Sequence, residues 1–200
     1  GGWVTDTMQK TLGPAKYHER LPWFADVKGD GQVWAWGANN VGQLGDASTI
    51  DRLSPVEVRI IGGGVAAIAA GGNHNLALLG DGHVLAWGLN NTGQLGRNSP
   101  PNSYSQPVTI DNLTGVQAIA AGQQHSLALK SDGRVVAWGW NDYGQLGDGA
   151  TSQRSSRLEV LDLADVVAVA AGSNHNLALK SDGTVVAWSE NDVPIGLSNV

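Results

Sequence analysis

The chain has 200 residues, of which 42% are hydrophobic, and it carries a net charge of −6. That length can bury a substantial core, and the apolar content argues against disorder despite 28 glycines. The absence of cysteine excludes disulfides, cysteine-ligated zinc and thiol catalysis. The acidic balance without a Lys/Arg cluster argues against nucleic-acid binding, and no apolar run is long enough to span a membrane.

Residues 1–20 match nothing else in the sequence and stay unassigned. From residue 21 an internal repeat organises the chain, with approximate copies at 21–64, 65–115, 116–165 and 166–200. Asp-Gly, Gly-x-x-His and Gly-Gln-Leu-Gly segments recur in one register. A tryptophan recurs with them at spacings of 51, 51 and 50 residues, at Trp36, Trp87, Trp138 and Trp188. Repetition at this period predicts a propeller or another repeat fold.

The copy at 116–165 shows the predicted elements most clearly. Val116–Ala121 is a short apolar strand, and His125–Lys130 alternates polar and apolar residues. An Asp-Gly hairpin turn follows, and Arg134–Trp138 is the returning strand. Leu158–Leu161 is the candidate for a fourth, outer strand. No window has a 3.6-residue period, so we expect almost no helix.

The first strand of each copy is rich in alanine, as at Ala118, Ala120 and Ala121. Innermost propeller strands converge near the axis, where small side chains fit, and the tryptophan of the third strand then fills the wider gap between blades. We therefore expect an all-β propeller of antiparallel sheets. A β-solenoid is the structural alternative, although its coils are usually shorter and lack regular hairpin turns.

The segment 121–147 reads Ala-Gly-x-x-His-x-Leu-Ala-Leu-Lys-x-Asp-Gly, then Val-x-Ala-Trp-Gly and Gly-Gln-Leu-Gly. It resembles the repeat of the regulator of chromosome condensation (RCC1-type) family, and the resemblance covers roughly residues 20–200. It implies a seven-bladed propeller. Family members include a nucleotide-exchange factor for a small GTPase, a plant ultraviolet photoreceptor, ubiquitin-ligase accessory domains and a bacterial protein inhibitor of β-lactamase.

The two ends depart from the repeat. Leu21–Asp30 aligns with Gly72–Asp81 as a degraded first copy and places Trp23 where later copies have histidine, while the last copy loses Gly-Gln-Leu-Gly. Seven blades of about 50 residues would need roughly 350 residues. We therefore expect about four blades forming an open arc, and rank a piece of a longer protein first. Self-association of two chains through the open ends comes second, and closure into a four-bladed ring comes last.

The recurring histidines His74, His125 and His175 are the first candidates for metal ligands. Successive blades lie roughly 10 Å apart, so one ion cannot collect three equivalent side chains. We expect each histidine to hold the loop before its strand by hydrogen bonding. We predict no metal and no cofactor, because a glycine-rich run at 62–67 precedes a strand instead of following one, and each Asp-Gly turn offers a single carboxylate.

The four recurring tryptophans are predicted to be structural. The resemblance offers ultraviolet sensing, but the photoreceptor's Gly-Trp-Arg-His segment has no equivalent at 71–74, 122–125 or 172–175. Trp34 and Trp140 fall outside the repeated position, so they are candidates for exposed contacts with a partner.

The variable segments 47–59, 98–109 and 149–159 differ while the framework repeats, which favours a non-enzymatic module that binds a protein partner through loops. Tyr and Arg are favoured at interfaces, so the candidate partner-binding residues include Tyr104, Arg97, Arg154 and Arg157. Guanine-nucleotide exchange on a small GTPase is the alternative, implied by the resemblance alone. The compartment stays open, with a secreted or surface location favoured.

Overall fold

A computed structural model describes residues 24–27, 31–60, 64–97, 101–189 and 195–197, and within these ranges it contains strands and turns but no helix. The first sheet holds β1 (Phe24–Val27), β2 (Val33–Gly37) and β3 (Arg52–Glu57). The second holds β4 (Val65–Ala70), β5 (His74–Leu79), β6 (Val84–Leu89) and β7 (Ser103–Thr109). The third holds β8 (Val116–Ala121), β9 (His125–Lys130), β10 (Val135–Gly139) and β11 (Arg154–Glu159). The fourth holds β12 (Val166–Ala171), β13 (Asn176–Lys180), β14 (Val185–Trp188) and β15 (Ile195–Leu197).

Each sheet is an antiparallel meander in which strands pair in chain order. The outer strand of the third sheet begins at Arg154, four residues before the predicted start at Leu158. A register shift between Ala137 and Gly139 explains the difference, because it lets Gly139 pair with Arg154 as well as Ala137 with Leu158. Each variable segment therefore contains the outer strand of its sheet, β3, β7 or β11, whereas the sequence predicted loops there.

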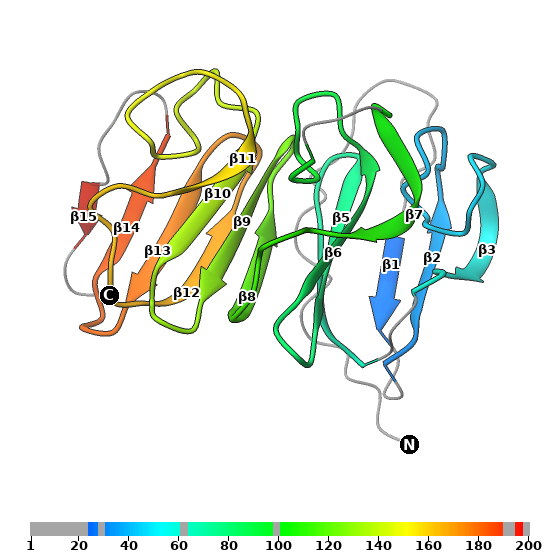
Figure 1. The fold of residues 1–200 in the computed structure, drawn as a ribbon, viewed down its shortest axis with the longest axis horizontal. Helices are drawn as coiled ribbons and strands as arrows, with labels where there is room; N and C mark the ends of the chain where they lie inside the picture. Colours follow the sequence, from blue (N-terminus) through cyan, green and yellow to red (C-terminus); the bar gives the residue numbers. More distant parts are fainter. Residues whose placement is uncertain (1–23, 28–30, 61–63, 98–100, 190–194, 198–200) are drawn as a thin grey trace.

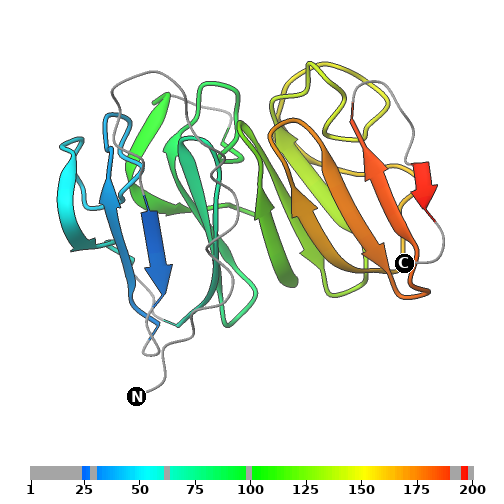
Figure 2. The ribbon, with the colours of Figure 1, turned by 180° about the vertical axis from the view of Figure 1, so that it is seen from behind.

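The four sheets follow one another in chain order as an open arc (Figure 1). The alanine-rich strand β8 contacts both β4 and β12, and β1 contacts β4. The first and fourth sheets lie at opposite ends of the molecule, also when it is seen from behind (Figure 2). The described residues therefore form an open arc of an all-β propeller, as predicted, and not a closed four-bladed ring. Trp23 and residues 1–20 lie outside the described residues.

The core lies in the seams between sheets. Trp87 packs in a cluster with Val33 and Leu44 of the first sheet and its loop. Trp138 packs in the same way against the second sheet, and Trp188 against the third. Each seam is thus filled by the tryptophan of the later sheet, which is the placement that the repeat predicted.

Candidate binding surface

One hydrogen-bond pattern joins each sheet to the next. The backbone oxygen of Gln94 accepts a bond from the indole Nε1 of Trp138 (2.8 Å) and another from Ser126 Oγ (2.8 Å). Gln43 receives the equivalent bonds from Trp87 and Asn75, and Gln145 receives them from Trp188 and Asn176. The Gly-Gln-Leu-Gly loop of one sheet is therefore fastened to the second and third strands of the following sheet.

The buried histidines extend this pattern. His74 Nε2 lies 3.0 Å from Ser126 Oγ, and His125 Nε2 lies 2.7 Å from Asn176 Oδ1. Ser126 has one proton and donates it to Gln94, so His74 must donate to Ser126 and carry its proton on Nε2. Each histidine thus bonds to the following sheet. The predicted hold on the loop before the strand is made by the backbone, since Gly71 N donates to the His74 carbonyl (2.9 Å) and Gly122 N to the His125 carbonyl (2.9 Å), whereas the rings bond across the seam.

Burial lowers the pKa of His74 to about 3 and that of His125 to about 4. The Nδ1 atoms of both rings are buried and have no hydrogen-bond partner among the described residues. A second proton on either ring would therefore place a charge in a buried seam, on an atom that has no acceptor among the described residues. His175 differs, since its ring is exposed at the end of the arc.

The four recurring tryptophans also differ in burial. Trp87, Trp138 and Trp188 are at most 2% exposed, whereas Trp36 is only half-buried. Among the described residues no sheet precedes the first one, whereas Trp87, Trp138 and Trp188 each pack against a preceding sheet. Trp36 is therefore less buried than its three equivalents.

Two loops are closed by an ion pair. Asp46 lies 2.6 Å from Arg52, and Asp148 lies 3.4 Å from Arg154. Asn39 and Asn141 organise these loops by donating to the same aspartates and to loop carbonyls. Burial opposes ionisation of Asp46, but bonds from Ser48 and Arg52 outweigh it and hold its pKa below the usual value. Arg154, a candidate for partner binding, is thus engaged in closing its own loop.

The second sheet replaces this ion pair with a different contact. The Arg97 guanidinium lies over the Tyr104 ring at 5.6 Å from its centroid, and Arg97 Nη1 donates to the carbonyl of Thr109 (3.0 Å). Arg157 on β11 donates across the seam to the carbonyl of Gly96 (3.2 Å). Three of the predicted partner-binding residues therefore gather at the seam between the second and third sheets.

A second aromatic pair lies on the loop after β10. The rings of Trp140 and Tyr143 meet edge to face, with centroids 5.1 Å apart and planes at 88°. Tyr143 is 37% exposed and Trp140 is half-buried. Trp34, the other predicted contact residue, is half-buried on β2 away from this pair. Sequence reasoning missed Tyr143, although its place within the Gly-Gln-Leu-Gly loop region, where other copies have Val41 and Thr92, was a usable signal.

The part of the chain that the structure describes contains no group of three or more His, Cys, Asp or Glu residues placed to hold a metal ion. It also contains no helix long and apolar enough to cross a membrane. The buried polar side chains, Gln94 and Asn141 among them, take part in the bonds that fasten seams and loops.

Known proteins share this architecture. A profile of the RCC1-like domain matches residues 24–193. The chain belongs to the RCC1-like domain family. It is 35% identical over 126 residues to the ultraviolet-B receptor UVR8 of Arabidopsis thaliana, a match that covers 62% of this chain and 28% of the receptor. It is 34% identical over 152 residues to the RCC2 homolog of Danio rerio, covering 74% of this chain and 30% of that protein.

A solved structure of this family shows the same fold. Prp20p of Saccharomyces cerevisiae, described together with its binding to Gsp1p and histones, superposes with a TM-score of 0.74 at 25% identity. The match covers 92% of this chain and 52% of Prp20p. The chain thus spans about half of that solved chain and less than a third of the two curated relatives. The resemblance to the RCC1-type repeat is confirmed.

Proposed function

We propose that this chain is a non-enzymatic protein-binding module whose contact surface is the loop edge that carries Trp140 and Tyr143. The observation that supports it most directly is the edge-to-face pair of these two rings. Trp87, Trp138 and Trp188 fill seams and bond to carbonyls, whereas Trp140 belongs to no buried cluster of the described residues. A partly exposed aromatic pair on a rigid base is the kind of anchor that dominates protein interfaces.

The rigid base supports the same proposal. Residues that could serve catalysis, such as His74 and His125, are buried in seams and fixed by hydrogen bonds. Loops held on a rigid scaffold are favourable for recognition because little ordering is required on binding. Prp20p, the yeast relative described with Gsp1p and histones, is a protein of this fold that binds other proteins.

The test is affinity capture with the immobilised chain, followed by identification of the bound protein. The double variant Trp140→Ala with Tyr143→Ala should lose the captured protein while keeping its unfolding temperature. Leu53→Ala is the matched control, because Leu53 is 88% exposed and lies on the first sheet. Undiminished capture by the aromatic double variant would overturn the proposal.

Nucleotide exchange on a small GTPase is the alternative function, and it rests on family likeness alone. A nucleotide-release assay with a panel of small GTPases distinguishes the two. Accelerated nucleotide release would favour the exchange function, because a module that only binds its partner would leave the release rate unchanged.

A further inference from the structure

The loop between β6 and β7 carries an unpaired positive charge at Arg97, whereas the equivalent loops of the first and third sheets carry a neutralised Asp–Arg pair. The strand registers place Arg52, Tyr104 and Arg154 opposite Gly37, Gly88 and Gly139, so these three residues are equivalent. In the first and third sheets the arginine at this place neutralises an aspartate. In the second sheet the aspartate is replaced by Arg97 and the arginine by Tyr104. An internal ion pair has become a cation resting on an aromatic ring.

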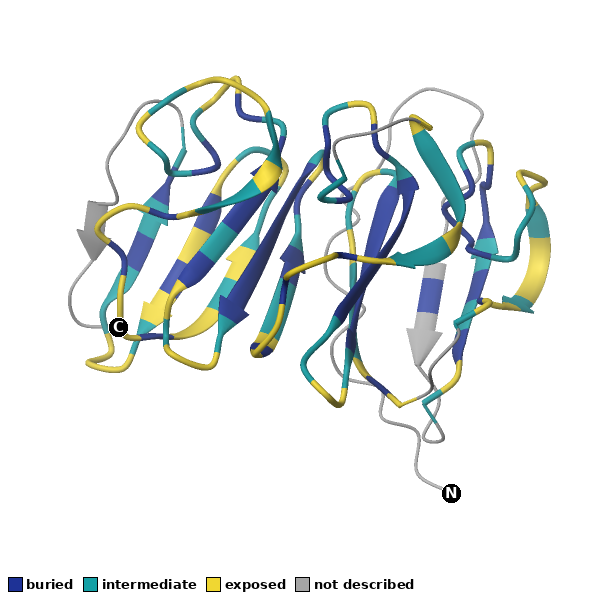
Figure 3. Cartoon of the chain, viewed as in Figure 1, coloured by how far each residue is buried: buried dark blue, intermediate teal, exposed yellow. Residues whose placement is uncertain are grey.

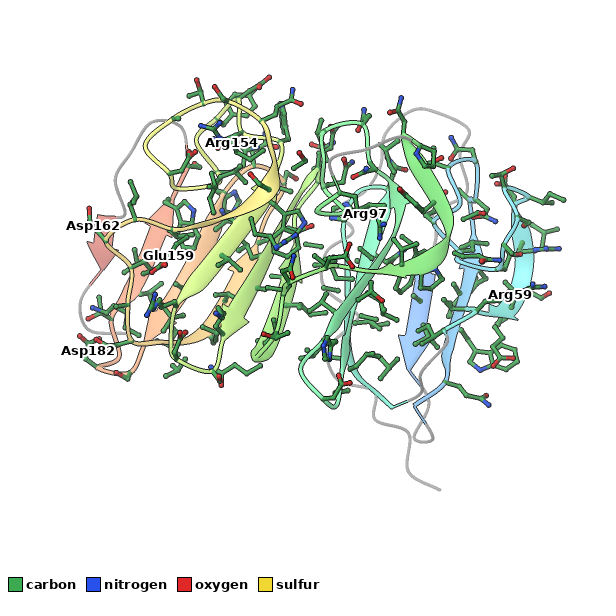
Figure 4. The ribbon with its side chains drawn as sticks, in the orientation of Figure 1. Arg59, Arg97, Arg154, Glu159, Asp162 and Asp182 are labelled. Atoms are coloured by element: carbon green, nitrogen blue, oxygen red, sulfur yellow. The ribbon has the colours of Figure 1, made fainter. Side chains whose placement is uncertain are left out.

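Arg97 has no carboxylate within ion-pair distance among the described residues. Its side chain contacts the Tyr104 ring and donates one bond from Nη1 to the Thr109 carbonyl. A guanidinium has five donors in a planar fork, so most of the donors of Arg97 stay open. Figure 4 labels Arg97 over the second sheet and Arg154 at the loop edge of the third.

A second guanidinium reaches the same place from the next sheet. Arg157 Nη1 donates to the carbonyl of Gly96, the residue that directly precedes Arg97. A Cβ at Gly96 would lie 3.5 Å from Arg157 Nη1, so this glycine admits the arginine closely. Arg157 likewise has no carboxylate within ion-pair distance in the described ranges. By contrast, Arg134 on the same sheet pairs with Asp132 and Glu159.

We propose that Arg97, Tyr104 and Arg157, here called the arginine seam, bind a carboxylate-bearing segment of the protein partner. Arg157 bonds to the residue that precedes Arg97, neither guanidinium is neutralised by a described carboxylate, and an acidic segment at this seam would supply the charge-assisted bonds that both lack. The chain has 18 acidic residues, yet none of the described ones neutralises this seam. The net charge of −6 disfavours an extended polyanion, so a short acidic peptide fits better than nucleic acid.

This inference rests on the proposed function and deepens it, because the backbone that leads to the aromatic pair packs against the loop that leads to Arg97. A Cβ at Gly139 would lie 3.2 Å from the Cα of Gln94, which places the residue before Trp140 against the loop that ends at Arg97. One partner segment could therefore contact the aromatic pair and place an acidic side chain in the seam.

The test is fluorescence anisotropy with a labelled peptide of Glu, Gly and Ser, compared with the same peptide carrying Gln in place of Glu. The Glu peptide should bind and the Gln peptide should not. Arg97→Gln and Arg157→Gln should each weaken binding about two- to fivefold, the range for a partly exposed ion pair. Arg134→Gln removes the same charge from a paired arginine and should leave binding unchanged.

Several outcomes overturn the inference. They are equal binding of both peptides, no binding, or an equal loss with Arg134→Gln, which would show a general charge effect. Tighter binding of a single-stranded oligonucleotide, lost with the same variants, would show a phosphate site. Arg157→Lys keeps the charge if Arg157→Gln does not fold. If the proposed function fails, the variant without Trp140 and Tyr143 captures the partner protein as well as the parent chain does. If only this inference fails, that capture persists and is insensitive to Arg97 and Arg157.

Discussion

The third and fourth sheets carry the same repeat. The face of the third sheet that contacts the fourth sheet is buried, whereas the equivalent face of the fourth sheet is partly exposed. Leu127 and Leu129 on β9 are 0% exposed, whereas their equivalents Leu177 and Leu179 on β13 are 40% and 38% exposed. His125 is buried and His175 is exposed. Figure 3 shows buried residues along the strands of the inner sheets and exposed ones alternating along β13.

The difference shows that each repeat forms one side of a seam, and that the neighbouring repeat must provide the other side. The face of the third sheet is buried because the fourth sheet brings Trp188 and Asn176 to it. Within the described residues, nothing brings the equivalent groups to the fourth sheet. Stability in such a chain is a sum over repeats and nearest-neighbour seams, so equal substitutions should have unequal effects in the two places.

The largest effect is expected for Trp138→Ala. This ring is 0% exposed and bonds to the Gln94 carbonyl, so truncation should lower the free energy of unfolding by about 3–5 kcal/mol. Trp36→Ala at the other end of the arc should cost less, because Trp36 is half-buried. Urea unfolding of both variants measures the difference. A loss below about 1 kcal/mol for Trp138→Ala would contradict its role in the core.

The next effect is a loss of stability in mild acid. The pKa of His74 is about 3 and that of His125 about 4 in the folded chain, below the ordinary value of 6.5. The unfolded chain therefore takes up protons first, and stability that is fully present above pH 6.5 declines as the pH falls toward 4. For His125 alone the loss approaches roughly 3 kcal/mol.

His125→Gln should flatten this decline, and His175→Gln is the matched control because that ring is exposed. Unfolding free energies between pH 7 and pH 4.5 provide the measurement. Identical slopes for the parent chain and His125→Gln would show that the ring does not stay neutral in the seam.

A third comparison concerns the first glycine of the Gly-x-x-His segment, at Gly122 in the third sheet and at Gly172 in the fourth. A Cβ at Gly122 would overlap the His125 ring and lie 2.7 Å from the Gly172 carbonyl. Because that ring is buried, Gly122→Ala should cost about 1–3 kcal/mol, the range for overpacking. At Gly172 the three nearest atoms all belong to the ring of His175, which is exposed and can rotate away. Gly172→Ala should therefore shift the unfolding temperature much less, and equal shifts would contradict the comparison.

The repeat allowed much of this fold to be predicted. Val116–Ala121 and His125–Lys130 begin and end as predicted, because periodicity and Asp-Gly turns are local signals. The outer strand was misplaced because a bulge at Gly139 extends its pairing, and a bulge has no strong local signature. The partner of His74 could not be predicted, because Ser126 lies 52 residues away on another sheet.

The candidate site was predicted in part. Arg97, Tyr104 and Arg157 were selected by residue type, but their convergence depends on the seam that joins two sheets. Arg154 was selected for the same reason and proved to close its own loop, although Asp148 six residues earlier and the equivalent pair Asp46 and Arg52 were visible in the sequence.

The smallest effect is expected at the uncovered face of the fourth sheet. Replacing Leu177 and Leu179 together by serine should change the free energy of unfolding by no more than about 0.5 kcal/mol per site, as for surface positions. The matched variant Leu127→Ser should be strongly destabilising, because Leu127 is 0% exposed.

A large loss of stability in the Leu177, Leu179 double variant would mean that this face of the fourth sheet is covered in solution. The unfolding temperature of the parent chain would then rise with protein concentration if a second copy covers it. That result would support pairing of two chains through this face, whereas a small and concentration-independent effect would contradict such pairing.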